Sequence, residues 1–461
     1  MTARDGGVGS AVLTTLAARV DAGMPALVAD LESLVRIPSV SSLPHHHPDV
    51  ERSATEVARL LTAEGLDVVV VRAEEGLPSV IGHRPAPPGA PTVLLYAHHD
   101  VQPTGDPDGW TGAPFEPVER DGRLYGRGAA DDKAGLAVHL AAIRALGPDL
   151  PVGVTVLVEG EEEIGSPTLP ALLAEHRDRL AADVVVIADA LNWEVGTPAL
   201  TVSLRGLVEV IVEVATLEHP LHSGAFGGVV PDALAVLVRV LAGLHDDTGA
   251  VAVPGLVGRS APSPVEYDEQ QLRADAGLLP GVGLTGAGSV TDRLWHQPSV
   301  TVTGIDCPRV AEAPNALAAT ARAKISVRLA PGDDPDRALR ALTEHLHATA
   351  PHGAHVRVVP GIRAHPFAAD PTSPAHRLAL DAFGAAWPES TPVAIGVGGT
   401  IPLVHLLSSV FPHAAVLVTG VEDPDTRAHG YDESLHLGDF RNACLAEALL
   451  LQTLGSPNPT D

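Results

Sequence analysis

Four short apolar segments of this chain are each followed, at or just beyond their ends, by side chains that can bind a metal. PTVLLYAHHD ends at His98 and Asp100, VGVTVLVEGEEE ends at three glutamates, ADVVVIAD ends at Asp189, and HAAVLVTG lies a few residues before His429. Short runs rich in Val, Ile and Leu are typical of strands that are buried on both faces. Open α/β sheets bind their ligands beyond the carboxyl ends of such strands. The pattern therefore predicts one metal site built from distant parts of the chain.

The order of segments predicts an α/β fold with a second, smaller domain. Strands and helices alternate over residues 1–203, which favours a mostly parallel sheet flanked by helices. LVEVIVEV and ARAKISVRL then alternate apolar and polar residues, as in a half-exposed antiparallel sheet. Buried-strand segments return after about Phe367, in TPVAIGVGG and AAVLVTG. We therefore predict a first domain of residues 1–203 and 368–461, interrupted by an inserted α+β domain at 204–367.

Charge and cysteine content exclude several classes of protein. The formal net charge of −27 argues against binding nucleic acid, whose phosphates it would repel, and against docking on an anionic membrane. Two cysteines, Cys307 and Cys444, cannot form a disulfide framework, and we expect both in the core. The first twenty residues lack the basic leader of a signal peptide, and no apolar stretch is expected to span a bilayer, which takes roughly 20 residues. A cytoplasmic protein without a membrane segment is the expectation.

The HHD sequence at 98–100 offers a metal ligand with its own support. Alternate residues of an extended segment point the same way, so His98 and Asp100 can face one site while His99 faces elsewhere. A metal-bound imidazole usually donates its other N–H to a carboxylate, and Asp100 is close enough to accept it. Ordinary hydrogen bonds at the end of a strand would explain the same residues.

Two acidic segments have both a chemical and a structural interpretation. GRGAADDKAG carries Asp131 and Asp132, which either cap the helix that follows or bridge two cations. EGEEEIGS places three glutamates directly after a buried strand, which is costly unless a positive charge lies among them. One glutamate could bind a metal and leave a neighbour free as a general base, whereas a solvated acidic turn is the alternative.

Two further segments could contact a substrate. GVGGTIPL follows a strand and could offer backbone N–H groups and the Thr400 hydroxyl to an anion, or could form only a tight turn into a helix. LHSG places His222 beside a hydroxyl in the second domain, where a loop histidine is equally expected.

Taken together, these segments resemble the M20 family of zinc metallopeptidases, particularly its dipeptidase and carnosinase-like branch. Further matching pieces are LVRIPSVSS, GWTGAPFEPVERDGRLYGRGAADDKAG, LHSGAFGG, GGTIP and AHGYDES, which follow the family's order over nearly the whole chain. The resemblance implies two zinc ions, with Co²⁺ or Mn²⁺ as alternatives, that share a bridging carboxylate and a bridging water. It also implies that the inserted domain is a lid and dimerisation domain of a homodimer.

The resemblance assigns roles to single residues. The implied metal ligands are His98 and Asp189 on one ion, Glu163 and His429 on the other, and Asp131 between them. The implied catalytic residues are Glu162 as general base, Asp100 as partner of His98, and His222 reaching into the site of the partner protomer. The implied substrate-binding residues are Arg328, Gly399, Thr400 and Asn315. The chain departs from the family where Asn315 is followed by Ala-Leu-Ala and relatives commonly have Val-Ile-Pro.

The predicted reaction is hydrolysis of the amide bond of dipeptides or short peptides that carry a free C-terminal carboxylate. An N-acyl amino-acid deacylase of the desuccinylase or deacetylase type is the alternative within the family. A non-catalytic metal-dependent binding protein is the alternative outside it, although Glu162 would then have no use as a base. A structural calcium protein is disfavoured because histidine ligands suit zinc.

Overall fold

The computed structural model describes residues 9–260 and 263–456. Contacts between residues divide the chain into two compact units. Unit 1 consists of Met1–Val202, Ala369–Ile395 and Leu406–Asp461, and unit 2 of Ser203–Ala368 and Gly396–His405. The short segment 396–405 thus clusters with unit 2, although both of its neighbouring segments belong to unit 1.

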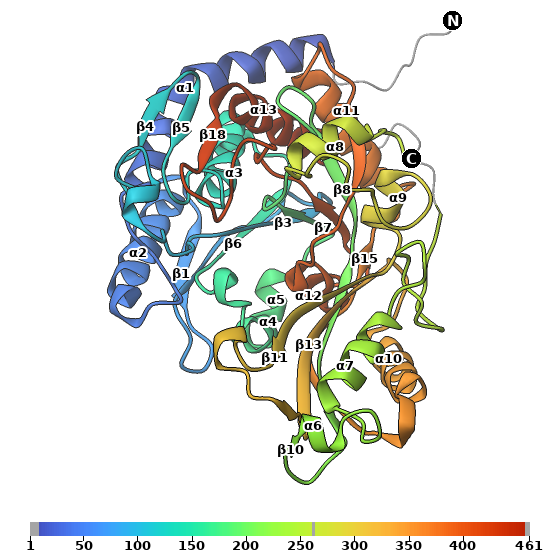
Figure 1. Ribbon diagram of the computed structural model, residues 1–461. Coiled ribbons are helices and arrows are strands. Elements are labelled where there is room, and N and C mark those ends of the chain that lie inside the picture. The colour runs from blue at the N-terminus through green and yellow to red at the C-terminus, as the bar shows by residue number, and fades with distance from the viewer. Residues whose placement is uncertain (1–8, 261–262, 457–461) are drawn as a thin grey trace, which may run out of the picture. The chain divides into compact units, whose positions relative to one another are not determined.

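Unit 1 is built on a twisted sheet whose central strands are parallel. The strand order is β1-β2-β6-β3-β7-β17-β8-β15, where β15 is Phe367–Ala368, and β16 also pairs with β8 (Figure 1). Strands β6, β3, β7 and β17 run parallel, whereas β1, β2, β8 and β15 pair antiparallel along this order. The strands are β1 (Asp67–Val71), β2 (Ser79–Arg84), β3 (Thr92–His98), β6 (Gly153–Glu159), β7 (Val184–Ile187), β8 (Ala199–Leu204), β16 (Val393–Val397) and β17 (Ala415–Val418). The predicted α/β class with a mostly parallel sheet is confirmed.

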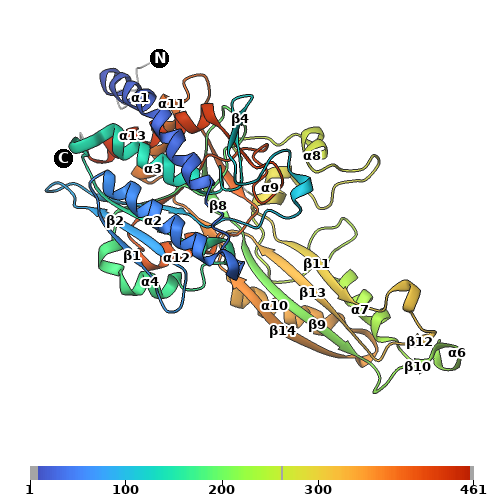
Figure 2. The same ribbon diagram turned by 90° about the vertical axis from the view of Figure 1, so that its left-hand side faces the viewer.

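Helices cover this sheet on both faces. One large apolar core joins the sheet to α1, α2, α3, α11 and α13, while α4 and α5 lie on the other face (Figure 2). The helices are α1 (Ser10–Val35), α2 (His47–Ala63), α3 (Lys133–Leu146), α4 (Leu169–Glu175), α5 (Arg177–Leu180), α11 (Pro374–Ala386), α12 (Pro402–Val410) and α13 (Leu437–Leu454). Because the central strands are buried on both faces, their sequences are continuous apolar runs.

Helix α1 corrects one expectation. By length and composition alone it is long and apolar enough to cross a bilayer, so the prediction that no stretch reaches that length is wrong for this helix. A buried core helix and an N-terminal signal sequence pass the same test. Leu27, Leu31 and Leu34 of α1 are buried in the core of unit 1, although only 17% of its most apolar window is buried.

A small three-stranded sheet lies beside the main sheet in unit 1. Its order is β18-β5-β4, formed by β18 (Ser434–His436), β5 (Arg123–Tyr125) and β4 (Val118–Arg120). The pairing of β18 with β5 joins two segments about three hundred residues apart, and Figure 1 shows them side by side. It therefore fixes the C-terminal end of the loop that carries His429.

Unit 2 is an antiparallel sheet backed by two helices. Its order is β11-β13-β9-β14, and Val208, Val210, Val212 and Val214 are buried under α7 and α10, as the alternation predicts. The elements are β9 (Gly206–Ala215), β10 (Leu221–His222), α6 (Ser223–Phe226), α7 (Ala233–Ala242), α8 (Glu269–Asp275), α9 (Val290–Trp295), β11 (Ser299–Asp306), β12 (Ala316–Leu317), β13 (Thr320–Leu329), α10 (Pro335–Thr349), β14 (His355–Ala364) and β15 (Phe367–Ala368).

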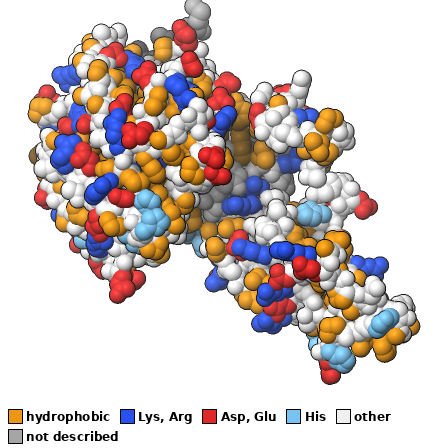
Figure 3. Space-filling model, turned by 60° about the vertical axis from the view of Figure 1, so that its left-hand side comes forward, with side chains coloured by type: hydrophobic (Ala, Val, Ile, Leu, Met, Phe, Trp, Pro, Cys, Tyr) orange, Lys and Arg blue, Asp and Glu red, His pale blue; other side chains and the backbone are white. Residues whose placement is uncertain are grey.

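The uncovered face of this sheet carries charged pairs. Lys324 pairs with Glu209 at 2.9 Å and Arg357 pairs with Glu213, and Figure 3 shows basic and acidic side chains beside one another on this unit. Cys444 is buried in α13 as expected. The expectation for Cys307 is wrong, since it is exposed just beyond β11, whose last residues are exposed as well.

Candidate metal centre

Three neighbouring parallel strands deliver the first residues of the site. Strands β6, β3 and β7 are adjacent and parallel, so their carboxyl ends lie at one edge of the sheet. His98 is the last residue of β3, Asp189 follows β7 by two residues, and the three glutamates follow β6. The edge expected from the sequence is therefore the edge at which these side chains gather.

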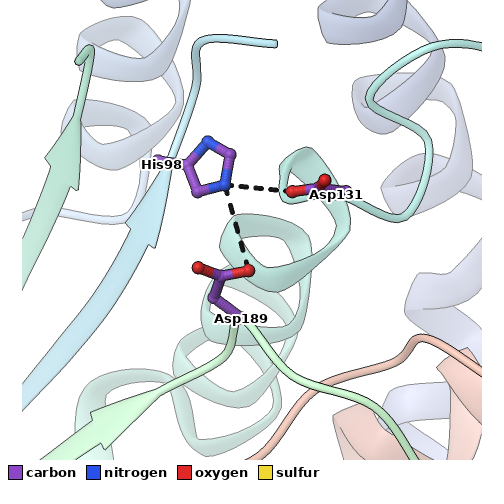
Figure 4. Close-up of side chains that lie close together, drawn as sticks. All are labelled: His98, Asp131 and Asp189. Carbon is purple, nitrogen blue, oxygen red and sulfur yellow. Dashed lines mark hydrogen bonds and ion pairs between the residues drawn. The ribbon is translucent and has the colours of Figure 1, made fainter. Parts of the chain in front are cut away.

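His98, Asp131 and Asp189 form the first group of potential ligands. The Nε2 atom of His98 lies 3.1 Å from Oδ1 of Asp131 and 4.0 Å from Oδ1 of Asp189 (Figure 4). All three donor atoms lie within 4.8 Å of one another. The His98 side chain is buried and Asp131 is nearly so. One imidazole nitrogen and two carboxylate oxygens thus face a common point.

Asp131, Glu163 and His429 form a second group. The Nε2 atom of His429 lies 3.0 Å from Oδ2 of Asp131 and 3.3 Å from Oε2 of Glu163. These donor atoms also lie within 4.8 Å of one another. Asp131 uses Oδ1 toward the first group and Oδ2 toward the second, so a single carboxylate joins the two.

The electrostatics of these acids fit a site for cations. Burial and the neighbouring Asp131 raise the pKa of Glu163 to about 8, and burial raises the pKa of Asp189 to about 6. Burial also acts on Asp131, but hydrogen bonds from His429 and His98 hold its pKa below the usual range. Carboxylates packed this closely are unfavourable without positive charge among them. A donor set of imidazole nitrogens and carboxylate oxygens around a shared carboxylate suits a pair of divalent metal ions.

Asp100 connects the first group to the glutamate loop. The Nδ1 atom of His98 lies 3.1 Å from the Asp100 carbonyl oxygen and 3.4 Å from its Oδ1 atom. The same carboxylate accepts the backbone N–H groups of Glu162 and Glu163, at 3.2 and 3.1 Å. His99 points elsewhere, with Nε2 2.9 Å from the Pro78 carbonyl oxygen.

The three glutamates have different surroundings. Glu161 accepts hydrogen bonds from the Leu77 backbone at 2.8 Å and from the Thr168 hydroxyl, so it anchors the loop. Glu163 faces the second group and accepts from Gln102 Nε2 at 2.7 Å. Between them, burial and the negative charge of Asp189 raise the pKa of Glu162 well above its usual range. Such a carboxylate binds a proton more readily than an exposed glutamate does.

Sequence reasoning missed the residues that hold the Asp131 loop. Glu433 accepts the backbone N–H groups of Gly128, Ala130 and Asp131 at 3.1–3.2 Å and pairs with Arg127 at 2.6 Å. The structural interpretation of Asp132 as a helix cap is wrong, since its side chain makes no capping hydrogen bond. Its Oδ2 atom accepts from the backbone N–H of His98 at 3.1 Å instead.

In unit 2 a second cluster contains two arginines. Nη1 of Arg328 donates to the Thr400 hydroxyl at 2.8 Å, and that hydroxyl donates to the Arg205 carbonyl at 2.6 Å. Arg205 Nε donates to the Gly398 carbonyl at 3.0 Å, and a Cβ atom on Gly398 would lie 2.7 Å from the Arg205 guanidinium. Burial, with the nearby Arg328, lowers the pKa of Arg205 to about 10. Two guanidinium groups and a hydroxyl thus lie close together next to Gly399 in the chain, a combination of donors that suits an anion. Arg205 had received no role from the sequence.

His222 and Asn315 meet in another part of unit 2. Strand β10 pairs with β12 so that His222 lies opposite Ala316. The Asn315 carbonyl accepts from the Ser223 backbone N–H at 3.1 Å and from the Ser223 hydroxyl at 2.9 Å. His222 is exposed, and its Nδ1 atom accepts the N–H of Gly224.

Comparisons with known proteins agree with this geometry. Residues 94–453 match Peptidase family M20/M25/M40. The cysteinylglycine-S-conjugate dipeptidase of Corynebacterium striatum is 37% identical over 92% of this chain and 95% of its own length. The structure of a dipeptidase from Saccharomyces cerevisiae superposes with a TM-score of 0.77 at 25% identity, covering 98% of this chain and 100% of its own. The structure of human carnosine dipeptidase 1 superposes with the same TM-score and identity, covering 96% of this chain and 99% of its own. The chain belongs to peptidase family M20/M25/M40 and is a metallohydrolase of that family.

Proposed function

We propose that this protein is a dinuclear zinc dipeptidase that hydrolyses dipeptides or short peptides with a free C-terminal carboxylate. The observation that carries the proposal is Asp131, whose two oxygens each face a separate group of one histidine and one further carboxylate. His98 and Asp189 would hold one ion and Glu163 and His429 the other, with Asp131 shared between them. Co²⁺ or Mn²⁺ is the alternative to zinc.

The chemistry divides between the ions and Glu162. Bound zinc lowers the pKa of a coordinated water from about 15.7 toward 7 and polarises the substrate carbonyl. Glu162 takes the proton of the attacking water and passes it to the leaving amine, a role that its raised pKa suits. Asp100 keeps His98 oriented and holds the backbone of the loop that carries Glu162.

The substrate carboxylate binds in unit 2. Arg328, Thr400 and the backbone at Gly399 receive it, and Arg205 supports them through its contact with Thr400. Asn315 lies beside His222, which polarises the substrate carbonyl in the site of the partner protomer. This assignment makes residues 204–367 a lid and dimerisation domain, residues 1–203 and 368–461 a catalytic domain, and the protein a homodimer.

Relatives support the substrate class. The similar bacterial protein is named for cysteinylglycine S-conjugates, and the human structure for carnosine, so Cys-Gly and β-Ala-His are the first peptides to test. The strongly acidic surface favours a cytoplasmic enzyme that binds neither nucleic acid nor anionic membranes.

A substrate panel with and without chelator tests the function. We expect dipeptides to be hydrolysed, N-acetyl and N-succinyl amino acids to be poor substrates, and chelation to abolish activity. Glu162→Gln should retain metal while turnover falls by roughly 10²–10⁴-fold, because only proton transfer is removed. Preference for N-acyl amino acids would favour a deacylase instead. A metal-loaded protein inert toward every compound, or wild-type turnover in Glu162→Gln, would contradict the proposal.

A further inference from the structure

His429 occupies an exposed loop in an unfavourable backbone conformation. Its side chain is 59% exposed, and its φ of 61° lies in the left-handed region. Arg427 and Asp432, two and three residues away, also have positive φ values of 58° and 54°. Non-glycine residues in this region cost on the order of 1–3 kcal/mol each and persist where surrounding contacts hold them. Contacts of this loop with the rest of unit 1 must therefore fix His429.

Asp432 makes a two-point contact with a distant segment. Its Oδ1 atom accepts the backbone N–H of Thr111 at 2.8 Å, and its Oδ2 atom accepts the Thr111 hydroxyl at 2.6 Å. The partners are 321 residues apart in the chain. Both carboxylate oxygens are thus used on Thr111, so this acid serves to hold two loops together.

Aromatic packing reinforces the same junction. The Tyr431 ring meets the Trp110 ring edge-on, with centroids 6.4 Å apart at 84°. A Cβ atom on Gly109 would lie 2.7 Å from Tyr431, so glycine is needed there for the ring to pack. The Arg127 guanidinium lies 5.4 Å from the centre of the Trp110 ring and donates to the Gly430 carbonyl at 3.0 Å. The three residues that follow His429 are therefore all held by contacts with segment 109–127.

The base of the loop is fixed separately. Asp423 pairs with Arg123 at 2.9 Å, and β18 begins at Ser434 with its pairing to β5. The backbone N–H of Ser434 also donates to the Thr426 carbonyl at 2.9 Å. These contacts fix the two ends of the loop, whereas the contact of Asp432 with Thr111 acts close to His429 itself.

We propose that Thr111 and Asp432 are positioning residues that hold His429 toward Asp131 and Glu163 and so set the affinity of the second metal ion. The inference rests on the proposed two-metal function. It assigns to Thr111 and Asp432 the support of the second group of ligands. Neither residue lies in either group of potential ligands. Without this contact the loop is less ordered before metal binds. Binding of that ion must then also order His429, and the entropy cost of this ordering weakens the affinity.

Metal titration of matched variants tests the inference. Thr111→Val removes the hydroxyl donor, and Asp432→Asn removes the charge. Thr372→Val and Asp370→Asn are the controls. Thr372 donates its N–H and hydroxyl groups to Oδ1 of Asp370 at 2.9 and 2.7 Å, a Thr–Asp contact within one local turn on the surface of unit 1. Zn²⁺ binding is followed by competition with a chelating dye at fixed pH, and thermal unfolding in chelator checks the fold of each variant.

We expect the ion beside His429, identified as the one lost in His429→Ala, to lose roughly 10- to 100-fold in affinity in Thr111→Val and Asp432→Asn. This is the size typical of support from outside the ligand shell, and the other ion and both controls should be unchanged. Excess Zn²⁺ should restore dipeptide turnover. Wild-type affinities for both ions in these variants, while His429→Ala loses one ion, would overturn the inference and leave the dipeptidase function standing. Equal weakening of both ions would also overturn it. A wild-type protein that binds fewer than two ions would instead refute the two-metal function itself.

Discussion

At the scale of single residues, the acids of the candidate metal centre differ in their pKa values. Asp131 is held ionised by two histidines, whereas Glu163 and Asp189 are buried with like charges nearby and have raised pKa values. The metal-free chain therefore holds protons on Glu163 and Asp189 at pH values where exposed carboxylates are fully ionised. Metal ions must displace these protons, so binding couples to pH.

Metal affinity should accordingly rise with pH between 6 and 8.5. Below the pKa of a group, each proton that the metal displaces raises the metal affinity by up to about tenfold per pH unit. The contribution of Glu163 therefore rises up to about pH 8, and that of Asp189 up to about pH 6. Competition titrations at several pH values measure this, with ligand protonation in the dye corrected separately. Glu163→Gln should make the dependence on pH shallower below pH 8, while the raised pKa values of His98 and His429 leave part of it in place. An affinity that does not change with pH would contradict the assignment of these ligands.

The sequence could identify those site residues that are marked by a local pattern. His98 and Asp189 stand at the ends of buried strands, so strand position alone points to them. Asp131 and Asp132 are adjacent and chemically identical, and only the resemblance separated them. Glu433 was missed because its role is to accept N–H groups from a loop some three hundred residues earlier, which no local pattern encodes. Its spacing of four residues after His429 was the available signal.

At the scale of elements, a buried charged pair joins helices α3 and α13. The Nδ1 atom of His139 lies 2.8 and 3.0 Å from the two carboxylate oxygens of Glu447, and its Nε2 atom lies 3.0 Å from the Tyr96 carbonyl oxygen. Burial alone would lower the pKa of His139, but Glu447 raises it above the usual value. The pair therefore stabilises the contact between two core helices while His139 is protonated.

This pair should make stability depend on pH. A histidine whose pKa is raised by folding stabilises fully below its unfolded pKa of about 6.5, and the contribution is lost as pH rises through the folded value. Glu447→Gln should lower the free energy of unfolding by about 3 kcal/mol at pH 6 and by less at pH 8.5. Urea unfolding in chelator measures this. Glu64→Gln, which removes a partner of Arg144 on the same helix, is the control without a titrating histidine. An equal loss at both pH values would contradict the role of His139.

Element boundaries were predictable where the signals are local. Helix α3 covers Lys133–Leu146 as the sequence predicts, because its apolar residues are buried almost all round. Helix α1 continues without a break from Ser10 to Val35, although Pro25 lies inside it. Proline removes a single hydrogen bond there, and the apolar residues Val20 and Leu27 on either side of it are buried in the core. Packing of the whole helix thus outweighs the local penalty.

At the scale of the whole molecule, the potential metal ligands and the arginine cluster belong to different units of the chain. All five potential metal ligands belong to unit 1, while Arg205, Arg328 and Thr400 belong to unit 2. The change from buried to alternating strands is the feature of the sequence from which the smaller domain was predicted. The assignment of 396–405 to unit 2 could not be foreseen, because it depends on contacts of Arg205 with Val397 and Gly398 rather than on composition.

The most direct test of the account is the position of metal in the protein itself. Crystals of the zinc-loaded enzyme, measured at the zinc absorption edge, should give two anomalous peaks per chain about 3.5–4 Å apart. One peak should lie against His98 and Asp189, the other against Glu163 and His429, with the Asp131 carboxylate between them. A single peak, or two peaks away from Asp131, would contradict a dinuclear centre bridged by this residue.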